Sequence, residues 1–171
     1  MPLDRLYAGW RRRYVELASS GDHDEADEDA CIFCQLADGP IDVATGVVEL
    51  TETTFVVLNA FPYGSGHVLV LPRRHVAAIS GLTDEESAAL WRATTRSVLA
   101  IEAAYRPDGA NLGANLGRAG GAGIPGHLHL HVLPRWGGDT NFMTAIAETR
   151  VLPEDLDDTF TKLRDAFAAL N

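Results

Sequence analysis

The most regular alternation of polar and apolar positions lies in residues 127–133, which read His-Leu-His-Leu-His-Val-Leu. Successive side chains of a β-strand point to opposite faces, so His127, His129 and His131 would share one face. The large aliphatic residues between them would pack against a core on the other face. Imidazole transfers protons, attacks electrophiles and binds metal near neutral pH, and three imidazoles on one face make a poor core. The pattern therefore predicts a strand whose histidine face is functional.

The same periodicities predict the other elements. The expected strands are Val47–Leu50, Phe55–Leu58, His67–Leu71 and a strand within Ala110–Leu116. A long helix is expected from Thr83 to about Tyr105, because Thr83 and Glu86 have the spacing of a capping box. Amphipathic helices are expected over residues 3–18 and from Pro153, at a first helical position, through the apolar stripe that ends at residue 170. Strands joined by turns around one long helix predict an α+β domain with an antiparallel sheet.

Length and charge narrow the classes of function. The chain has 171 residues, 46% of them hydrophobic, and we expect one domain spanning 1–171. Residues 22–29 are acidic without an apolar period and are expected to form a solvated linker. We expect a cytoplasmic protein with no membrane partner, because the sequence contains neither a membrane-spanning apolar run nor a signal-peptide profile. The net charge of −10 argues against a nucleic-acid partner, although a small anion can still bind to local amides and imidazoles.

The two cysteines lie together, as Cys31 and Cys34 in Cys-Ile-Phe-Cys. In a reducing compartment this spacing suits a metal or redox pair better than a structural disulfide. One pair cannot fill a tetrahedral zinc site, so two further ligands would have to come from elsewhere. The alternative is that both cysteines are small buried hydrophobic residues beside Ile32 and Phe33.

A glycine-rich loop precedes the histidine strand, with Gly117, Gly120, Gly121 and Gly123. Glycine lets backbone N–H groups approach anionic oxygens closely, and neighbouring imidazoles can supply a nucleophile and proton donors. The loop and the histidines together predict a phosphate site. A metal enzyme with three histidine ligands on one strand is a further alternative.

The histidine motif resembles that of the histidine triad family, in which three histidines alternate with hydrophobic residues. Residues 55–59 and 66–72 resemble the family's nucleotide-binding hairpin, and the likeness covers roughly residues 31–136. It implies a histidine-triad fold, with an N-terminal helix and linker over 1–30 and a C-terminal extension over 137–171. Residues 134–143 resemble bacterial diadenosine tetraphosphate phosphorylases, near the fragile-histidine-triad branch.

The resemblance implies roles for the triad. His129 matches the nucleophile that attacks the α-phosphorus of a nucleotide and forms a nucleotidyl-histidine intermediate, while His131 matches a partner that hydrogen-bonds to the phosphate. His127, the first histidine, completes the catalytic set.

The same likeness implies a nucleotide-binding set. Asn59 matches a ribose contact, and His67 lies in the hairpin, either as part of the nucleotide site or as a stabiliser of the turn. The other implied residues are Asn115, Gly123, Ile124 and Trp136. The first three of them would lie along the phosphates.

Gly123 departs from the pattern of the hydrolytic branch, which typically has Gln four residues before the first histidine. Glycine removes a side chain that could orient water and leaves space for inorganic phosphate, so we expect phosphorolysis of a diadenosine tetraphosphate-type substrate. One alternative is a hydrolase for dinucleoside polyphosphates or nucleoside phosphoramidates. Another is a nucleotide-binding signalling module with little turnover.

Relatives with an N-terminal Cys-x-x-Cys imply a zinc site made of Cys31, Cys34, His75 and His127. Four protein ligands leave no open coordination position, so the zinc would be structural. The resemblance implies no organic cofactor and indicates a homodimer, formed through the long helix and the neighbouring sheet edge, or a homotetramer.

Overall fold

The structure is a computed structural model that describes residues 31–139 and 152–170. The expected helix over 3–18 and the acidic linker lie outside the described residues.

The core of the fold is one antiparallel sheet of five strands in the order β1-β2-β3-β5-β4. The strands are β1 (Val47–Leu50), β2 (Thr54–Leu58), β3 (Val68–Pro72), β4 (Gly109–Gly113) and β5 (Leu130–Arg135). The α-helices are α2 (Ile32–Ala37), α3 (Asp84–Tyr105) and α5 (Leu156–Ala169), and short 3-10 turns cover Ile79–Gly81 and Arg118–Gly120. This confirms the predicted α+β class.

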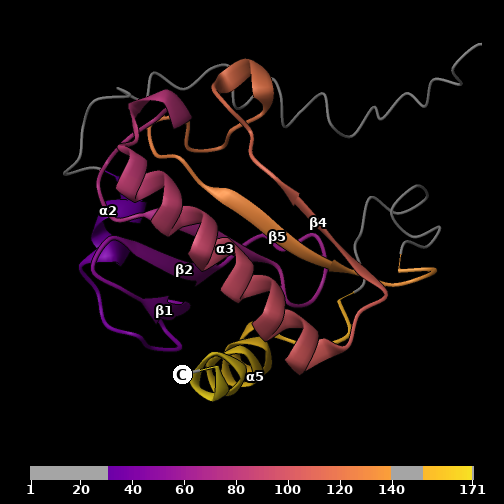
Figure 1. The fold of residues 1–171 in the computed structure, drawn as a ribbon. Coiled ribbons are helices and arrows are strands. Elements are labelled where there is room, and N and C mark those ends of the chain that lie inside the picture. Colours follow the sequence, from indigo (N-terminus) through magenta and orange to yellow (C-terminus); the bar gives the residue numbers. More distant parts are fainter. Residues whose placement is uncertain (1–30, 140–151, 171) are drawn as a thin grey trace, which may run out of the picture.

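The two faces of the sheet bury different clusters. Even-numbered positions such as Val56, Val68 and Val70 pack with α3 and α5, and Figure 1 shows α3 lying across this face. Odd-numbered positions such as Phe55 and Leu69 pack with Cys31 and Phe33 at α2. The strands β2 and β3 are buried at every position because both faces are covered.

The boundaries of α3 agree with the sequence. Thr83 accepts a hydrogen bond from the Glu86 amide, and the Glu86 side chain accepts one from the Thr83 amide, which completes the predicted capping box. Arg106 ends the helix in a left-handed conformation, with φ 47°. No helix within residues 31–139 or 152–170 combines the length and apolar character needed to cross a bilayer.

Several predicted boundaries were wrong, and the largest error concerns the histidine strand. β5 begins at Leu130, because the Leu128 amide bonds to the Val76 carbonyl instead of to a neighbouring strand. The strand expected within Ala110–Leu116 is β4, which begins one residue earlier, at Gly109, and whose last pair with β5 is Gly113 with His131.

The other errors concern helix ends and β3. The C-terminal helix starts at Leu156 and not near Pro153, because the Asp155 side chain caps it by accepting from the Asp158 amide. β3 starts at Val68, one residue later than predicted. The helix α2 was not predicted from the sequence.

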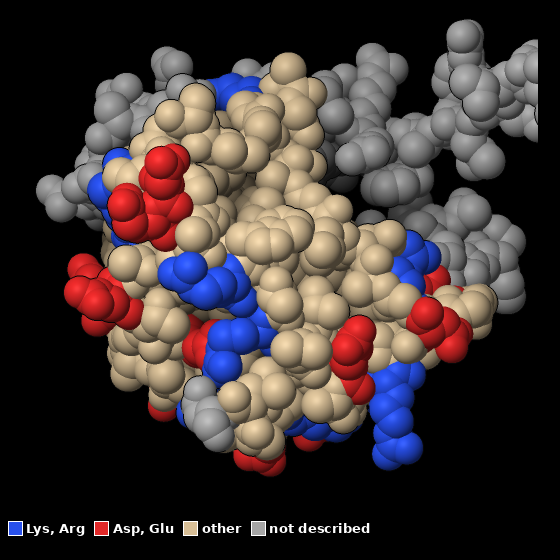
Figure 2. Space-filling view, viewed as in Figure 1, with Lys and Arg blue, Asp and Glu red and all other residues tan. Residues whose placement is uncertain are grey.

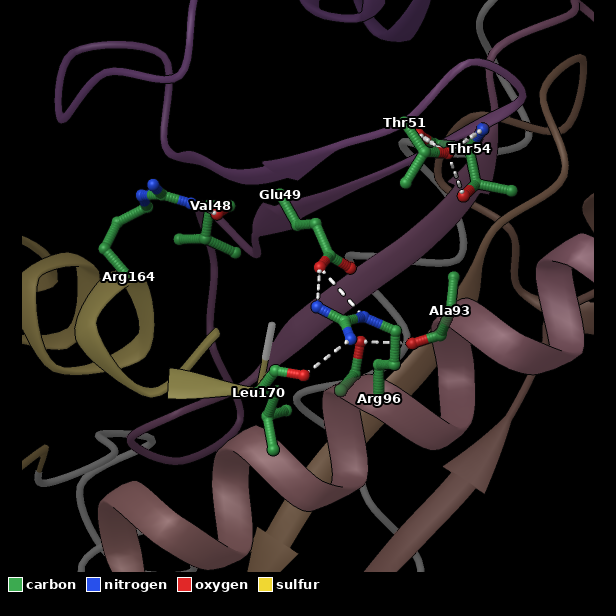
Figure 3. A network of polar contacts seen from close by, with 9 residues as sticks. Val48, Glu49, Thr51, Thr54, Ala93, Arg96, Arg164 and Leu170 are labelled. Carbon is green, nitrogen blue, oxygen red and sulfur yellow. Dashed lines mark hydrogen bonds and ion pairs between the residues drawn. The ribbon is translucent and has the colours of Figure 1, made fainter. Parts of the chain in front are cut away.

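A polar network attaches α5 to the rest of the fold (Figure 3). Arg96 of α3 donates from Nε and Nη2 to Glu49 Oε1 of β1, at 3.0 and 2.7 Å, and from Nη1 to the Leu170 carbonyl. Arg164 of α5 donates to the Val48 carbonyl. The helix that follows the undescribed segment is thereby held against β1 and α3.

Charges on the α3 face are mixed. Figure 2 shows basic and acidic side chains interspersed over this side, with no extended basic patch among the described residues in view.

Candidate active site and metal centre

The four side chains that the sequence assigns to zinc lie together. Cys31 and Cys34 are three residues apart at the start of α2, a spacing that puts both on one side of a helical turn. The ligand atoms of Cys31, Cys34, His75 and His127 all lie within 4.8 Å of one another.

Three distances in this cluster are close to those between ligands around a tetrahedral ion. His127 Nδ1 is 3.5 Å from each cysteine sulfur, and His75 Nδ1 is 3.2 Å from Cys34 Sγ. Ligands about 2.0–2.3 Å from a zinc ion lie roughly 3.3–3.8 Å apart around a tetrahedron. Two thiols and two imidazoles are also a donor set that zinc prefers, so the residues fit a structural zinc ion.

The hydrogen bonds of His127 orient its ring toward the sulfurs. Its Nε2 donates to the Pro72 carbonyl at 2.9 Å, which leaves the lone pair of Nδ1 facing Cys31 and Cys34. Burial lowers the pKa of His127 to about 4, so the ring is neutral at pH 7. The structure therefore places the His127 imidazole in the metal cluster, while its main chain belongs to the adjoining site.

His129, the proposed nucleophile, is buried beside this cluster. Its Nδ1 donates to the His127 carbonyl at 2.8 Å, so a neutral ring has its lone pair on Nε2. Burial lowers the pKa of His129, which favours that neutral form. Phe33 of α2 packs against the ring, with centroids 5.3 Å apart. The side chain is thus held as a neutral imidazole with a defined unprotonated nitrogen.

His131 lies two residues further on, inside β5, with its ring centroid 5.2 Å from that of His129. Its Nδ1 is 2.9 Å from His67 Nε2. Its own Nε2 is buried and has no hydrogen-bond partner within the described part of the chain. A buried polar atom of this kind beside a nucleophile is suited to contact a substrate oxygen.

Asn59 and His67 belong to one hydrogen-bonded turn between β2 and β3. Asn59 Oδ1 accepts from the Phe61 amide at 2.9 Å, and Asn59 Nδ2 is 3.3 Å from His67 Nδ1. His67 is fully buried and joins this turn to His131.

The other predicted nucleotide contacts are dispersed. Asn115 Nδ2 donates to the Gly121 carbonyl at 3.1 Å and so braces the glycine-rich loop. Gly123 is exposed in that loop, and Ile124 packs against the cluster that contains Phe33.

Trp136 is not brought to the histidines. Its ring contacts Tyr105 of α3, with centroids 6.2 Å apart, and Tyr105 packs against the core on the α3 face of the sheet. Within one chain this tryptophan therefore lies on the face opposite His129 and His131.

Two aromatic residues at the site were missed from the sequence. Phe33 contacts both His127 and His129, and Tyr63 stacks on His131 with an interplanar angle of 14°. The sequence could have indicated Phe33 through its position inside Cys-Ile-Phe-Cys, because a site that contains both cysteines also places the phenyl ring between them close to the histidines. Tyr63 is in an irregular turn, where no periodicity predicts the direction of a side chain.

A HIT domain matches residues 43–138, which is more than half of the chain. The chain therefore belongs to the HIT domain family. An "AP-4-A phosphorylase" of Mycobacterium tuberculosis is 45% identical over 113 residues, which cover 66% of this chain and 58% of the relative's length. The chain thus matches less than two thirds of that relative. A "Bis(5'-adenosyl)-triphosphatase" of Dictyostelium discoideum is 35% identical over 85 residues, covering 50% of this chain and 56% of the relative.

Among solved structures, the chain is similar to a zinc-bound histidine triad family protein from Mycobacterium smegmatis. The two share 28% identity with a TM-score of 0.67, over 84% of this chain and 97% of the other. This likeness agrees with the sheet and helices described above.

Proposed function

We propose that this protein is a nucleotidyltransferase that cleaves diadenosine tetraphosphate-type dinucleotides by phosphorolysis. The observation that carries the proposal is the bond from His129 Nδ1 to the His127 carbonyl, which leaves an unprotonated Nε2 on a neutral imidazole. The similarity to a relative named as an AP-4-A phosphorylase supports the substrate class.

In the first step His129 Nε2 attacks the α-phosphorus. An N–P bond forms while the P–O bond to the leaving polyphosphate breaks, and its electrons go to that oxygen. His131 donates a hydrogen bond from Nε2 to a phosphate oxygen, where negative charge increases in the transition state. A covalent intermediate divides one difficult displacement into two easier ones.

In the second step an oxygen of inorganic phosphate attacks the same phosphorus. The N–P bond breaks and its electrons return to Nε2, which releases ADP and restores neutral His129. Gly123 supports phosphate as the acceptor, because it is exposed and has no side chain to fill the loop beside the triad.

The direct test supplies diadenosine tetraphosphate with and without inorganic phosphate and identifies the nucleotides formed. Phosphorolysis gives ADP and ATP only when phosphate is present. AMP and ATP, independent of phosphate, would identify the hydrolase, the alternative supported by the similarity to the triphosphatase. Tight nucleotide binding with no product in either case would identify a signalling module.

Gly123→Gln tests how the acceptor is selected. A glutamine would occupy the phosphate space and could orient water, so the ratio of ADP to AMP should fall about tenfold, equivalent to about 1.4 kcal/mol between the competing transition states. Gly120→Gln is the matched control, because it adds the same side chain elsewhere in the exposed loop, and neither glycine is among the described residues with positive φ. An equal ratio in both variants would show that Gly123 does not select the acceptor.

We also propose that Cys31, Cys34, His75 and His127 hold a structural zinc ion, which supplies folding energy and no open position for a reactant. The purified protein should contain one zinc per chain, and Cys34→Ser should lose it and unfold at a lower temperature. A chelator should destabilise the wild type but leave Cys34→Ser unchanged. Metal-free wild type of equal stability would leave the cysteines as core residues.

A homodimer is the assembly that we propose, with a tetramer as the alternative. β4 is an edge strand whose five residues are all exposed, and an unpaired edge is a template for another strand. Sedimentation should give at least twice the monomer mass, and Leu112→Lys should reduce it.

A further inference from the structure

The cluster of Cys31, Cys34, His75 and His127 shares a residue with the triad. The His127 ring faces the two cysteines, with Nδ1 3.5 Å from each sulfur, while its carbonyl accepts from His129 Nδ1 at 2.8 Å. That second bond fixes the lone pair of His129 on Nε2. A change at the cysteines that moves His127 therefore also reaches the proposed nucleophile.

Phe33 makes a second connection between the cysteines and the triad. It lies between Cys31 and Cys34 at the start of α2, and only 6% of it is exposed. Its ring packs against His127 and His129, with centroids 5.6 and 5.3 Å away. Close-packed side chains transmit small displacements, because few voids can absorb them. A rearrangement of the turn that contains the cysteines must therefore move a ring that contacts both histidines.

The cysteines have a chemistry of their own, in addition to binding a metal. Neither is in a disulfide, Cys34 is partly exposed, and Cys31 is buried. Residues three apart on a helical turn have Cβ atoms about 5–6 Å apart, whereas a disulfide needs about 3.5–4.5 Å. A tightening of this turn brings the two sulfurs within bonding distance. Zinc binds thiolates and a disulfide has none, so oxidation of the pair removes two of the four ligands.

We propose that Cys31 and Cys34 are an oxidisable pair, and that their disulfide releases the metal and withdraws His129 from its bond to the His127 carbonyl. With a peroxide as the oxidant, the two thiolates lose two electrons and form one S–S bond. The O–O bond of hydrogen peroxide accepts those electrons and, with two protons, gives two molecules of water. A dithiol reverses the step and lets the thiolates bind zinc again.

The parts of this proposal have separate foundations. The spacing of the cysteines and the contacts from their turn to His129 come from the structure. The release of a metal rests on the proposed zinc site, and the effect on turnover rests on the proposed function. Each part therefore has its own measurement.

The oxidation can be followed on the unmodified full chain by zinc release and by mass. In excess hydrogen peroxide, each chain should lose one zinc ion and the mass of two hydrogen atoms at the same rate, and dithiothreitol with zinc should restore both. Cys34→Ser cannot form the disulfide and should keep those hydrogen atoms. Cysteines that stay reduced, zinc that leaves without a disulfide, or a wild type that holds no zinc would overturn the proposal.

The ring of His129 gives the readout of the coupling. Two-bond ¹H–¹⁵N correlation spectra distinguish the protonated and unprotonated nitrogens of a neutral histidine, and the His129 signals can be assigned by comparison with His129→Ala. In the reduced protein His129 should be in the Nδ1–H form, and in the oxidised protein it should become a mixture of tautomers. Unchanged His129 signals in a protein with a complete disulfide would overturn the proposal.

Cys34→Ser is the matched control for oxidation elsewhere in the chain. Its His129 signals should not respond to peroxide, and a response equal to that of the wild type would overturn the proposal. If this variant does not fold, reversal by dithiothreitol replaces it, because dithiothreitol reduces a disulfide whereas methionine sulfoxide needs its own reductases.

The rates give a third readout. With diadenosine tetraphosphate and phosphate, oxidation should lower kcat about 100-fold, since a misplacement of about 1 Å costs about 10² in rate. Dithiothreitol with zinc should restore the rate, and full activity in a protein with a complete disulfide would overturn the proposal. If oxidation changes His129 as described and the reduced wild type cleaves no dinucleotide, the oxidisable pair stands and the proposed function fails.

Discussion

Gly66, directly before His67, gives a sharp test of the packing behind the active site. The residue has φ +75°, and an added Cβ would lie 2.9 Å from Tyr105 Cε2 and 3.1 Å from Pro134 Cγ. The tyrosine ring cannot easily move away, because its hydroxyl donates to Glu154 and its ring contacts Trp136. Gly66→Ala should therefore introduce both backbone strain and a steric conflict.

The expected loss of stability in Gly66→Ala is the sum of the backbone strain and the steric conflict. A left-handed conformation costs a residue with a Cβ about 1–2 kcal/mol, and an extra methyl in a packed core costs about 1–3 kcal/mol. The free energy of unfolding should therefore fall by about 2–5 kcal/mol. Gly46→Ala is the matched control, because Gly46 has φ +70° but its nearest neighbour, Leu58 Cβ, would be at an ordinary 3.5 Å. It should cost only the backbone part, about 1–2 kcal/mol.

Urea unfolding followed by tryptophan fluorescence measures both variants against the wild type. The reduced entropy of the unfolded chain is common to both substitutions, so it cancels in the comparison. If Gly66→Ala and Gly46→Ala lose the same free energy within about 0.5 kcal/mol, the ring of Tyr105 does not confine this turn and the steric argument is refuted.

Two further predictions concern charged contacts. Arg96→Met should lower the free energy of unfolding by about 2–4 kcal/mol, because it leaves the buried Glu49 carboxylate without its guanidinium partner. In a double-mutant cycle measured by urea unfolding, adding Glu49→Gln to the same chain should recover part of this loss. No recovery would contradict the assignment of the ion pair. The hydrogen bond from Arg74, with that from the Thr83 amide, lowers the pKa of Glu86 from 4.5 to about 2. The ionised Glu86 carboxylate therefore stabilises the fold fully above pH 4.5, and this contribution is lost as the pH falls toward 2. The stability difference between wild type and Glu86→Gln, measured by urea unfolding, should shrink between pH 5 and pH 3, and a difference that grows would contradict the assignment.

The long helix and the hairpin could be predicted because their signals are local. The capping box of Thr83 and Glu86 involves neighbouring residues only, and each hairpin strand is a short apolar run bounded by polar or glycine- and proline-containing turns. The gathering of the zinc ligands was predicted from a family resemblance, and the structure places them together. The six-residue helix α2 has too few residues for a helical period to be distinguished from a loop.

The histidine segment shows why strand pairing is harder to predict than strand pattern. His127 and His129 alternate with aliphatic residues as in a strand, yet the Leu128 amide between them bonds to the Val76 carbonyl, and the His127 carbonyl accepts from the His129 ring. Alternation reports which side is buried and not which amides are paired. The side on which Trp136 lies, in contrast, follows from the period of β5, since it continues the positions of Val132 and Pro134 that face α3.

The proposed reaction requires that His129 Nε2 becomes covalently attached to a nucleotide. The direct measurement mixes the protein with diadenosine tetraphosphate in the absence of phosphate and stops the reaction rapidly without acid, because the bond between histidine and phosphorus is labile in acid. The mass of the intact protein and peptide mapping then identify any adduct. We expect one adenylyl group per chain on His129 and no adduct in His129→Ala. When phosphate is added before the quench, the adduct should disappear and ADP should form. A wild type that turns over without any adduct, or a His129→Ala protein with near wild-type turnover, would contradict it.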